Sequence, residues 1–318
     1  MKKNIALGVL SYNVSEFIET VIDELSLLNE NIYILDDGSN DETLSKIKKI
    51  INKHKNIVLI KNSKNSGAGY STKKLILKAY EDGYDFLIKI DGDGQFLISD
   101  VKKVINLYNQ TDYQFIKSNR FWKNGIVGKI PKKRLFGNLF STMLLQIVTG
   151  TNKLFDPLNG LFGVSTIISP ELNKFYPKRY GYPFYITVVA IVNEFKTFQI
   201  NNVVKYENQK SSLNPFVVLF TLLKLSLYFY LKKIKLKKFI GIYQRSAFLD
   251  KSFIFLLVSN IFLFIGILYL LNFAVTTIVA PRTLLFIFVL SLILNIIIFI
   301  LSFKEEKSIR NTYIHNEI

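Results

Sequence analysis

The stretch FLIKIDGDGQ, residues 86–95, decides the fold. Its first half is a short apolar run, Phe86 to Ile90, and two aspartates, Asp91 and Asp93, follow at once with one glycine between them. A short apolar run bounded by a glycine-containing turn is typical of a buried strand. The pattern therefore places two carboxylates at the carboxyl end of a strand.

Residues 4 to about 120 alternate short apolar runs with helical patterns, which is typical of βαβ units and a mainly parallel sheet. Strands are expected at residues 5–10, 31–35, 57–61 and 86–90. The second of these runs into Asp36 and Asp37, so it also ends in carboxylates. Open α/β sheets bind ligands at the carboxyl ends of their strands. The sequence thus predicts an α/β domain with a ligand site at that end of its sheet.

Two loops carry residue pairs that are typical of helix N-termini. Asn13 with Glu16, and Ser39 with Glu42, have the spacing of a capping box. We expect each pair to begin the helix that follows its strand.

Asp91 and Asp93 are spaced to hold one divalent cation together. Their hard oxygen ligands suit Mg²⁺ or Mn²⁺, either of which bridges diphosphate oxygens. On its own such a pair more often caps a helix or faces solvent. The apolar strand before it and the second acidic strand end favour the metal site. The chain has no cysteine and only two histidines, so a zinc or iron site is not expected.

The C-terminal part is strongly apolar, although the chain of 318 residues carries a formal charge of +17. No charged side chain occurs between Lys251 and Arg282, nor between Arg282 and Lys304. Each interval is long enough for the roughly 20 apolar residues that cross a bilayer as a helix. We expect transmembrane helices at about 253–272 and 283–303. A buried hairpin of a soluble domain is the alternative, and two uncharged runs of this length disfavour it.

Basic residues flank both apolar runs, which predicts a hairpin with both of its flanks, and both chain termini, in the cytoplasm. They are Lys232, Lys233, Lys235, Lys237, Lys238, Arg245, Lys251, Lys304, Lys307 and Arg310. A nucleic-acid-binding module predicts basic residues interleaved with aromatics on one face, whereas these charges crowd the membrane flank, so a lipid bilayer is the expected partner and nucleic acid is not. The N-terminus turns polar too soon for a cleavable signal peptide.

The expected organisation has three parts: an α/β domain at 1–212, a basic juxtamembrane region at 213–251, and the two spans with a short tail at 252–318. Residues 214–231 are apolar with one lysine and run straight into the lysine cluster. This favours a helix lying in the membrane interface over a third span.

Seven short motifs then identify a resemblance. They are SYN at 11–13, LDDGSNDET at 35–43, KNSGAG at 64–69, IDGDGQ at 90–95, SNRF at 118–121, PKKRLFGN at 131–138 and DPLNGLFG at 156–163. Their order and spacing over roughly residues 4–215 resemble the family-2 glycosyltransferases of GT-A fold. The chain is most similar to the branch that holds dolichol-phosphate mannose synthases and polyprenyl-phosphate glycosyltransferases, in which two C-terminal spans recur.

The resemblance implies an enzyme that transfers a sugar with inversion from a UDP- or GDP-sugar to a polyisoprenyl phosphate at the cytoplasmic membrane face. The nucleotide-binding residues that it implies are Ser11, Tyr12, Asn13, Asp36, Asp37, Lys64, Gly67 and Asp91. The implied metal ligands for Mg²⁺ or Mn²⁺ are Asp91, Asp93 and Gln95. The implied phosphate and acceptor residues are Arg120, Arg134, Lys210 and Ser212, and the implied catalytic residues are Asp156, Asp93 and Arg134.

Several alternatives stay open at this point. Asp156 either deprotonates the acceptor or only positions groups, and Lys64 with its glycine turn either meets the nucleotide or only connects strand to helix. Asn159 and the segment NQKSSL, 208–213, depart from the family pattern, which puts the acceptor's identity in doubt. A diacylglycerol or a lipid-linked oligosaccharide is the alternative acceptor, and a non-catalytic nucleotide-sugar-binding membrane protein is the alternative function. The sequence also leaves open whether copies of the chain associate.

Overall fold

The computed structural model describes most of the chain. The described residues are 3–122, 125–128, 130, 132–173, 176–206, 215–237, 252, 254–266, 279–310 and 314–316. They form two compact units, one made of Met1–Ser226 with Asn311–Ile318 and the other of Leu227–Arg310. Each unit is described by itself.

The first unit is built on an eight-stranded sheet in the order β10-β8-β5-β7-β4-β1-β2-β3. Its strands are β1 (Ile5–Ser11), β2 (Asn31–Asp36), β3 (Ile57–Lys61), β4 (Phe86–Asp91), β5 (Phe115–Asn119), β7 (Phe162–Ser165), β8 (Thr197–Asn201) and β10 (Ile314–Asn316). All neighbours are parallel except β7, which runs antiparallel to both β4 and β5. The four strands predicted from apolar runs are present, and the α/β class is confirmed.

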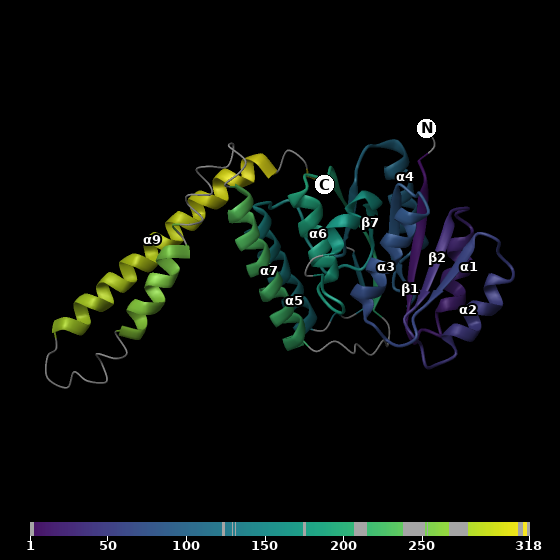
Figure 1. The fold of residues 1–318 in the computed structure, drawn as a ribbon, viewed down its shortest axis with the longest axis horizontal. Helices are drawn as coiled ribbons and strands as arrows, with labels where there is room; N and C mark the ends of the chain where they lie inside the picture. The colour runs from purple at the N-terminus through teal and green to yellow at the C-terminus, as the bar shows by residue number, and fades with distance from the viewer. Residues whose placement is uncertain are drawn as a thin grey trace. The chain divides into compact units, whose positions relative to one another are not determined.

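Helices connect and cover these strands. They are α1 (Ile18–Ser26), α2 (Thr43–Ile51), α3 (Ala68–Glu81), α4 (Ile98–Gln110), α5 (Lys132–Thr149) and α6 (Tyr182–Val192), with a 3₁₀ helix, η1 (Thr166–Asn173). Helices α1 and α2 pack side by side, and α3 packs on β1, β2 and β4 (Figure 1). A separate two-stranded sheet pairs β6 (Ile126–Gly128) with β9 (Val204–Tyr206).

The core explains why the first strands fold as the apolar runs predict. Every residue of β1 is buried, as expected for a parallel strand covered on both faces. Ile18 and Ile22 of α1 and Val104 of α4 are fully buried in the same apolar cluster as the central strands. This burial is the main favourable term in folding, and it holds the strand ends firmly in place. Lys89 in β4 and Lys117 in β5 are fully buried exceptions to the apolar pattern.

The two predicted capping boxes are wrong. Helix α1 begins at Ile18 and α2 at Thr43, and neither has a capping hydrogen bond from its N-cap side chain. Instead the two loops bond to one another: Asn13 N donates to Ser39 Oγ at 3.0 Å, and Asn40 N donates to Asn13 Oδ1 at 2.9 Å. The polar side chains satisfy a neighbouring loop, because the parallel pairing of β1 and β2 brings both loops to the same end of the sheet.

Helix α7 (Pro215–Lys237) begins in the first unit and ends in the second. One of its faces is buried through Leu222, Leu225 and Phe229, whereas Phe216 and Phe220 are exposed. The second unit also holds α9 (Val279–Arg310), in which Phe286–Lys304 has a mean hydropathy of 2.9 and is long enough to cross a membrane.

The first predicted span, 253–272, is only partly visible. Its described part is an apolar helix, Ile254–Gly266, and the remainder lies outside the described residues. The two-span hairpin and the interfacial character of 214–231 therefore stay predictions.

Candidate active site

Asp37 organises the loop between β3 and α3. Its carboxylate accepts hydrogen bonds from Asn62 Nδ2 at 2.8 Å, Ser66 N at 2.9 Å, Gly67 N at 2.8 Å and Ser71 Oγ at 2.9 Å. The residue is almost completely buried. Asp37 therefore shapes the loop that carries Lys64 and Gly67, and its oxygens are engaged within the protein.

Other residues predicted to bind the nucleotide lie at the carboxyl ends of β1 and β2. Asp36 is buried and accepts hydrogen bonds from the backbone N–H and the hydroxyl of Ser39. Ser11 is also buried, and its hydroxyl donates to a carbonyl of β2. Tyr12 and Asn13, by contrast, are exposed. The structure thus brings these residues to one end of the sheet, with Tyr12 and Asn13 at its surface.

The glycines of the KNSGAG turn allow close backbone packing. Gly67 has a φ of +99°, and a Cβ added there would lie 2.6 Å from the carbonyl oxygen of Lys178. Gly69 N donates to Arg179 O at 3.2 Å, and Tyr70 N donates to Lys178 O at 2.7 Å. These first-turn N–H groups of α3 are thus bonded to carbonyls. Sequence reasoning missed this role of the segment around Lys178.

Lys64 lies beside the acidic turn that follows β2. Gly38 has a φ of +74°, and a Cβ added there would lie 2.6 Å from the backbone carbon of Lys64. Lys64 itself is exposed. The backbone of the turn is therefore held against Asp36–Ser39, and the lysine side chain is at the surface.

Asp91 and Asp93 lie together at the carboxyl end of β4, as predicted. The ammonium of the fully buried Lys89 forms an ion pair with Asp91 Oδ1. Burial, and then the neighbouring Asp91 carboxylate, raise the pKa of Asp93 to about 6. Gln95 N donates to Asp93 Oδ1 at 3.2 Å. The raised pKa shows that a second negative charge is costly here.

This pair fits a divalent cation in one particular way. Among the described residues, no group of three or more His, Cys, Asp or Glu side chains converges on one point. A closed, all-protein metal cage is therefore absent from that part of the chain. Two carboxylates and the Gln95 amide are instead the kind of incomplete oxygen set with which Mg²⁺ is held alongside substrate phosphates and water.

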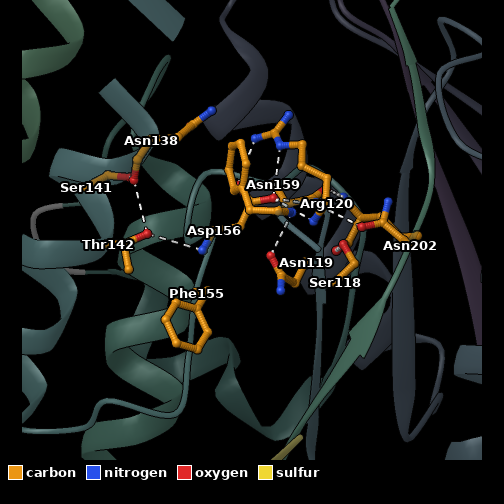
Figure 2. A network of polar contacts seen from close by, with 12 residues as sticks. Ser118, Asn119, Arg120, Asn138, Ser141, Thr142, Phe155, Asp156, Asn159 and Asn202 are labelled. Atoms are coloured by element: carbon orange, nitrogen blue, oxygen red, sulfur yellow. Dashed lines mark hydrogen bonds and ion pairs between the residues drawn. The ribbon is translucent and has the colours of Figure 1, made fainter. Parts of the chain in front are cut away.

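Asp156 is the centre of a buried polar network (Figure 2). It has a φ of 52° and is completely buried. Arg120 Nε lies 2.9 Å from its Oδ2, Arg120 Nη2 donates to its Oδ1 at 2.9 Å, and Arg120 N donates to Oδ2 at 3.1 Å. Asn159 Nδ2 also donates to Oδ2, at 3.1 Å. Both carboxylate oxygens therefore already accept hydrogen bonds or an ion pair, which is a poor arrangement for taking a proton.

The network extends beyond the residues that the sequence predicts. Asn159 Nδ2 donates to Asn202 Oδ1 at 3.0 Å, and Asp156 N donates to Thr142 Oγ1 at 3.3 Å (Figure 2). These bonds join the loop before β7 to α5 and to the turn after β8. Asn202 and Thr142 carry no sequence signal of their own. A lysine that interrupts an apolar run, as in FLIKI and FIK, could have drawn attention to Lys89 and Lys117.

Three predicted residues are not brought into the site by what the structure describes. Arg134 belongs to the first turn of α5, and its side chain lies outside the described residues. Lys210 and Ser212 lie outside them altogether. Their predicted phosphate contacts stay predictions.

Acidic ends of β2 and β4, set in a mostly parallel sheet with the antiparallel β7 inserted, define a GT-A-like α/β fold. The family model of glycosyl transferase family 2 matches residues 7–172, just over half of the 318 residues. The chain belongs to this family, as its motifs predicted.

Two curated relatives are similar over part of the chain. A UDP-N-acetylglucosamine–dolichyl-phosphate N-acetylglucosaminyltransferase of Methanococcus voltae is 31% identical over 159 residues, which are 45% of this chain and 63% of the relative. An uncharacterised protein of Methanocaldococcus jannaschii is 29% identical over 139 residues, 43% of this chain and 58% of the relative. The chain thus spans less than two thirds of the length of either.

A solved structure confirms the fold. Glucosyl-3-phosphoglycerate synthase from Mycobacterium tuberculosis, crystallised with Mn²⁺, UDP and glucosyl-3-phosphoglycerate, superposes with a TM-score of 0.53 at 18% identity, covering 70% of this chain and 80% of that one. The same enzyme with UDP alone gives 0.52 at 17% identity and the same coverage. At this identity the likeness concerns the fold.

Proposed function

We propose that this chain transfers a sugar from a UDP- or GDP-sugar to a polyisoprenyl phosphate, with inversion at the anomeric carbon. Membership of glycosyl transferase family 2 supports the transfer, and the Methanococcus relative, named for a dolichyl-phosphate acceptor, supports the acceptor class. The observation that carries the choice of acceptor is the state of Asp156. Its carboxylate is already occupied by Arg120 and Asn159.

An occupied Asp156 suits an acceptor that needs no general base. A hydroxyl must lose its proton when it attacks, whereas a phosphate monoester is already largely ionised at neutral pH. Arg120 pairs with the buried carboxylate of Asp156, and the pair holds the loop before β7 in place. A phosphate oxygen can then attack the anomeric carbon opposite the nucleotide, which inverts the configuration.

On the donor side, Asp91, Asp93 and Gln95 would hold Mg²⁺ or Mn²⁺ against the diphosphate. When bound, the cation would neutralise the charge that develops on the leaving nucleoside diphosphate. Structures of the Mycobacterium enzyme crystallised with Mn²⁺ and UDP have the same fold, which supports this proposal. Asp37 would act through the loop that it organises.

The membrane location follows from the C-terminus. Strand β10 pairs in parallel with β8, so Asn311–Ile318 belongs to the same unit as the site. A chain that crossed the bilayer only once would have its C-terminal residues on the opposite side from this unit. The pairing of β10 with β8 therefore supports an even number of crossings, in keeping with a hairpin of about 253–272 and 283–303. The lysine flanks support a cytoplasmic location for the catalytic domain and both termini.

The test is transfer by the purified full chain in detergent or lipid nanodiscs. With Mn²⁺ or Mg²⁺, the chain should move label from a UDP-sugar, with UDP-N-acetylglucosamine tried first and GDP-sugars next, onto undecaprenyl or dolichyl phosphate. Asp93→Ala and EDTA should each abolish the transfer while the protein stays folded. Transfer that survives both would contradict the metal assignment.

The nature of the product separates this proposal from its rivals. A glycosyl phosphate is released by mild acid, whereas a glycolipid formed on diacylglycerol is not. Acid-stable product would therefore overturn the acceptor class. Nucleotide binding without turnover on any lipid would instead identify a non-catalytic nucleotide-sugar-binding protein.

A further inference from the structure

Two buried lysines flank the strand that follows Asp156. In the sheet, β7 lies between β4 and β5, and Phe162 of β7 is the register partner of both Lys89 and Lys117. Register partners in antiparallel pairs project to the same face, so both ammonium groups lie on one face beside the start of β7. Both side chains are completely buried.

Lys117 binds the loop directly. Its ammonium donates to the backbone carbonyl of Asn159 at 2.5 Å and lies 5.3 Å from the centre of the Phe162 ring. Burial lowers the pKa of Lys117 to about 7, although the nearby Asp156 carboxylate opposes this shift. The charged form of Lys117 is therefore unfavourable at this position, and its ammonium is hydrogen-bonded to the Asn159 carbonyl.

Lys89 holds the other side of the same loop. It pairs with Asp91, and the second oxygen of Asp91 lies so near Gly160 that an added Cβ would be 2.1 Å from it. The main chain of this loop is thus bonded to Lys117 at Asn159 and packs at Gly160 against Asp91, the ion-pair partner of Lys89. Lys117 contacts the loop close to Asp156, and Lys89 contacts Asp91 of the proposed metal pair.

Lysines are almost never fully buried unless they are paired, because removing the ammonium from water is strongly unfavourable. A sheet interior that needed only packing would hold an apolar residue at both positions, as Ile88 and Ile90 do beside Lys89 and Ile116 does beside Lys117. Lys89 is paired with Asp91, which raises its pKa, whereas burial lowers the pKa of Lys117, whose contact is a neutral carbonyl.

We propose that Lys117 is a positioning residue for the acceptor side. By bonding to the Asn159 carbonyl, it fixes the loop that carries Asp156, the carboxylate partner of Arg120. This rests on the proposed function. Lys117 is too buried to touch either substrate, so it acts through the loop. Its loss should impair use of the lipid phosphate and leave donor binding intact.

The experiment compares Lys117→Met with Lys89→Met and with the exposed control Lys102→Met in the full chain. Binding of UDP with Mn²⁺ is read from the shift in melting temperature, and transfer rates are measured while donor and acceptor are varied separately. For Lys117→Met we expect kcat/KM for the lipid phosphate to fall about 10- to 100-fold, the range of supporting residues. Donor KM and the UDP shift should stay within about twofold of the wild type. Lys89→Met should change the donor side as well.

A second readout does not depend on which acceptor is used. Hydrogen exchange of the peptide 155–162 should speed up in Lys117→Met and in a second variant, Lys117→Gln, with exchange elsewhere in the sheet unchanged. Unchanged exchange in this peptide would overturn the proposal, even if the wild type transferred to another acceptor. An equal loss on donor and acceptor sides, together with a general fall in melting temperature, would show a merely structural lysine and would also overturn it.

Discussion

Replacing Gly160 by alanine adds one methyl group where the loop after Asp156 meets the metal pair. The new Cβ would lie 2.1 Å from Asp91 Oδ2, whereas ordinary contacts begin at 3.4 Å. The loop is held by Lys117, so the Asp91 carboxylate must retreat by about 1 Å to restore contact distance. A displacement of about 1 Å in a catalytic site can cost roughly 100-fold in rate. We expect kcat/KM of Gly160→Ala to fall by about that factor.

Gly137→Ala is the matched control. It adds the same methyl group within α5, where nothing lies within 4 Å of it. Alanine is favoured over glycine inside a helix by about 0.5–1 kcal/mol, so this variant should melt at a higher temperature. The assay is the initial rate of labelled-sugar transfer at several Mn²⁺ concentrations, with the melting temperature of each variant recorded. A Gly160→Ala protein with the wild-type rate and Mn²⁺ dependence would refute the reasoning. An equal loss of rate in Gly137→Ala would refute it too.

Three further outcomes follow from the buried charges. Asp156→Asn leaves the Arg120 charge without its anion, so it should lower the free energy of unfolding by about 3–5 kcal/mol, measured by denaturant titration. In the unfolded chain Lys117 keeps its proton up to its ordinary pKa of 10.5, whereas in the folded chain burial lowers its pKa to about 7. The unfolded state thus holds more protons above pH 7, so stability should rise from there toward pH 10 by at most about 1.4 kcal/mol per unit, and Lys117→Met should flatten the curve. Asp93→Asn should abolish transfer yet raise the melting temperature of the metal-free protein at pH 7.5, because the raised pKa of Asp93 shows that its charge is unfavourable there; a lower melting temperature would contradict this.

The strands and the acidic strand ends could be predicted because they depend on local sequence. A parallel strand buried on both faces reads as a continuous apolar run, which is the case for β1, β2 and β4, and the edge strand β3 is also an apolar run; all four have the predicted starts. The carboxylates that end β2 and β4 then lie at the same edge of the sheet, because both strands run parallel to β1, which lies between them. These features need no knowledge of distant partners.

The rest depends on contacts between distant residues. The insertion of β7 between β4 and β5 brings Asp156 to Arg120 across 36 positions of sequence, and no local pattern encodes that pairing. The predicted caps at Asn13 and Ser39 fail for the same reason, because each side chain finds a partner in the other loop. Polar residues that local rules assign to helix ends serve here to join loops.

The loop from Asp156 to Gly160 lies between the two halves of the proposed site. Asp156 at one end of the loop is held by Arg120, and Gly160 at the other end packs against Asp91 of the proposed metal pair. The main chain at Gly160 therefore leaves no room for a side chain beside Asp91. Both carboxylate oxygens of Asp156 already have donors, so in the proposed reaction this loop would contribute position rather than proton transfer. Such a loop is useful when the nucleophile arrives already ionised and only its alignment with the donor has to be set, which is the case for a lipid phosphate.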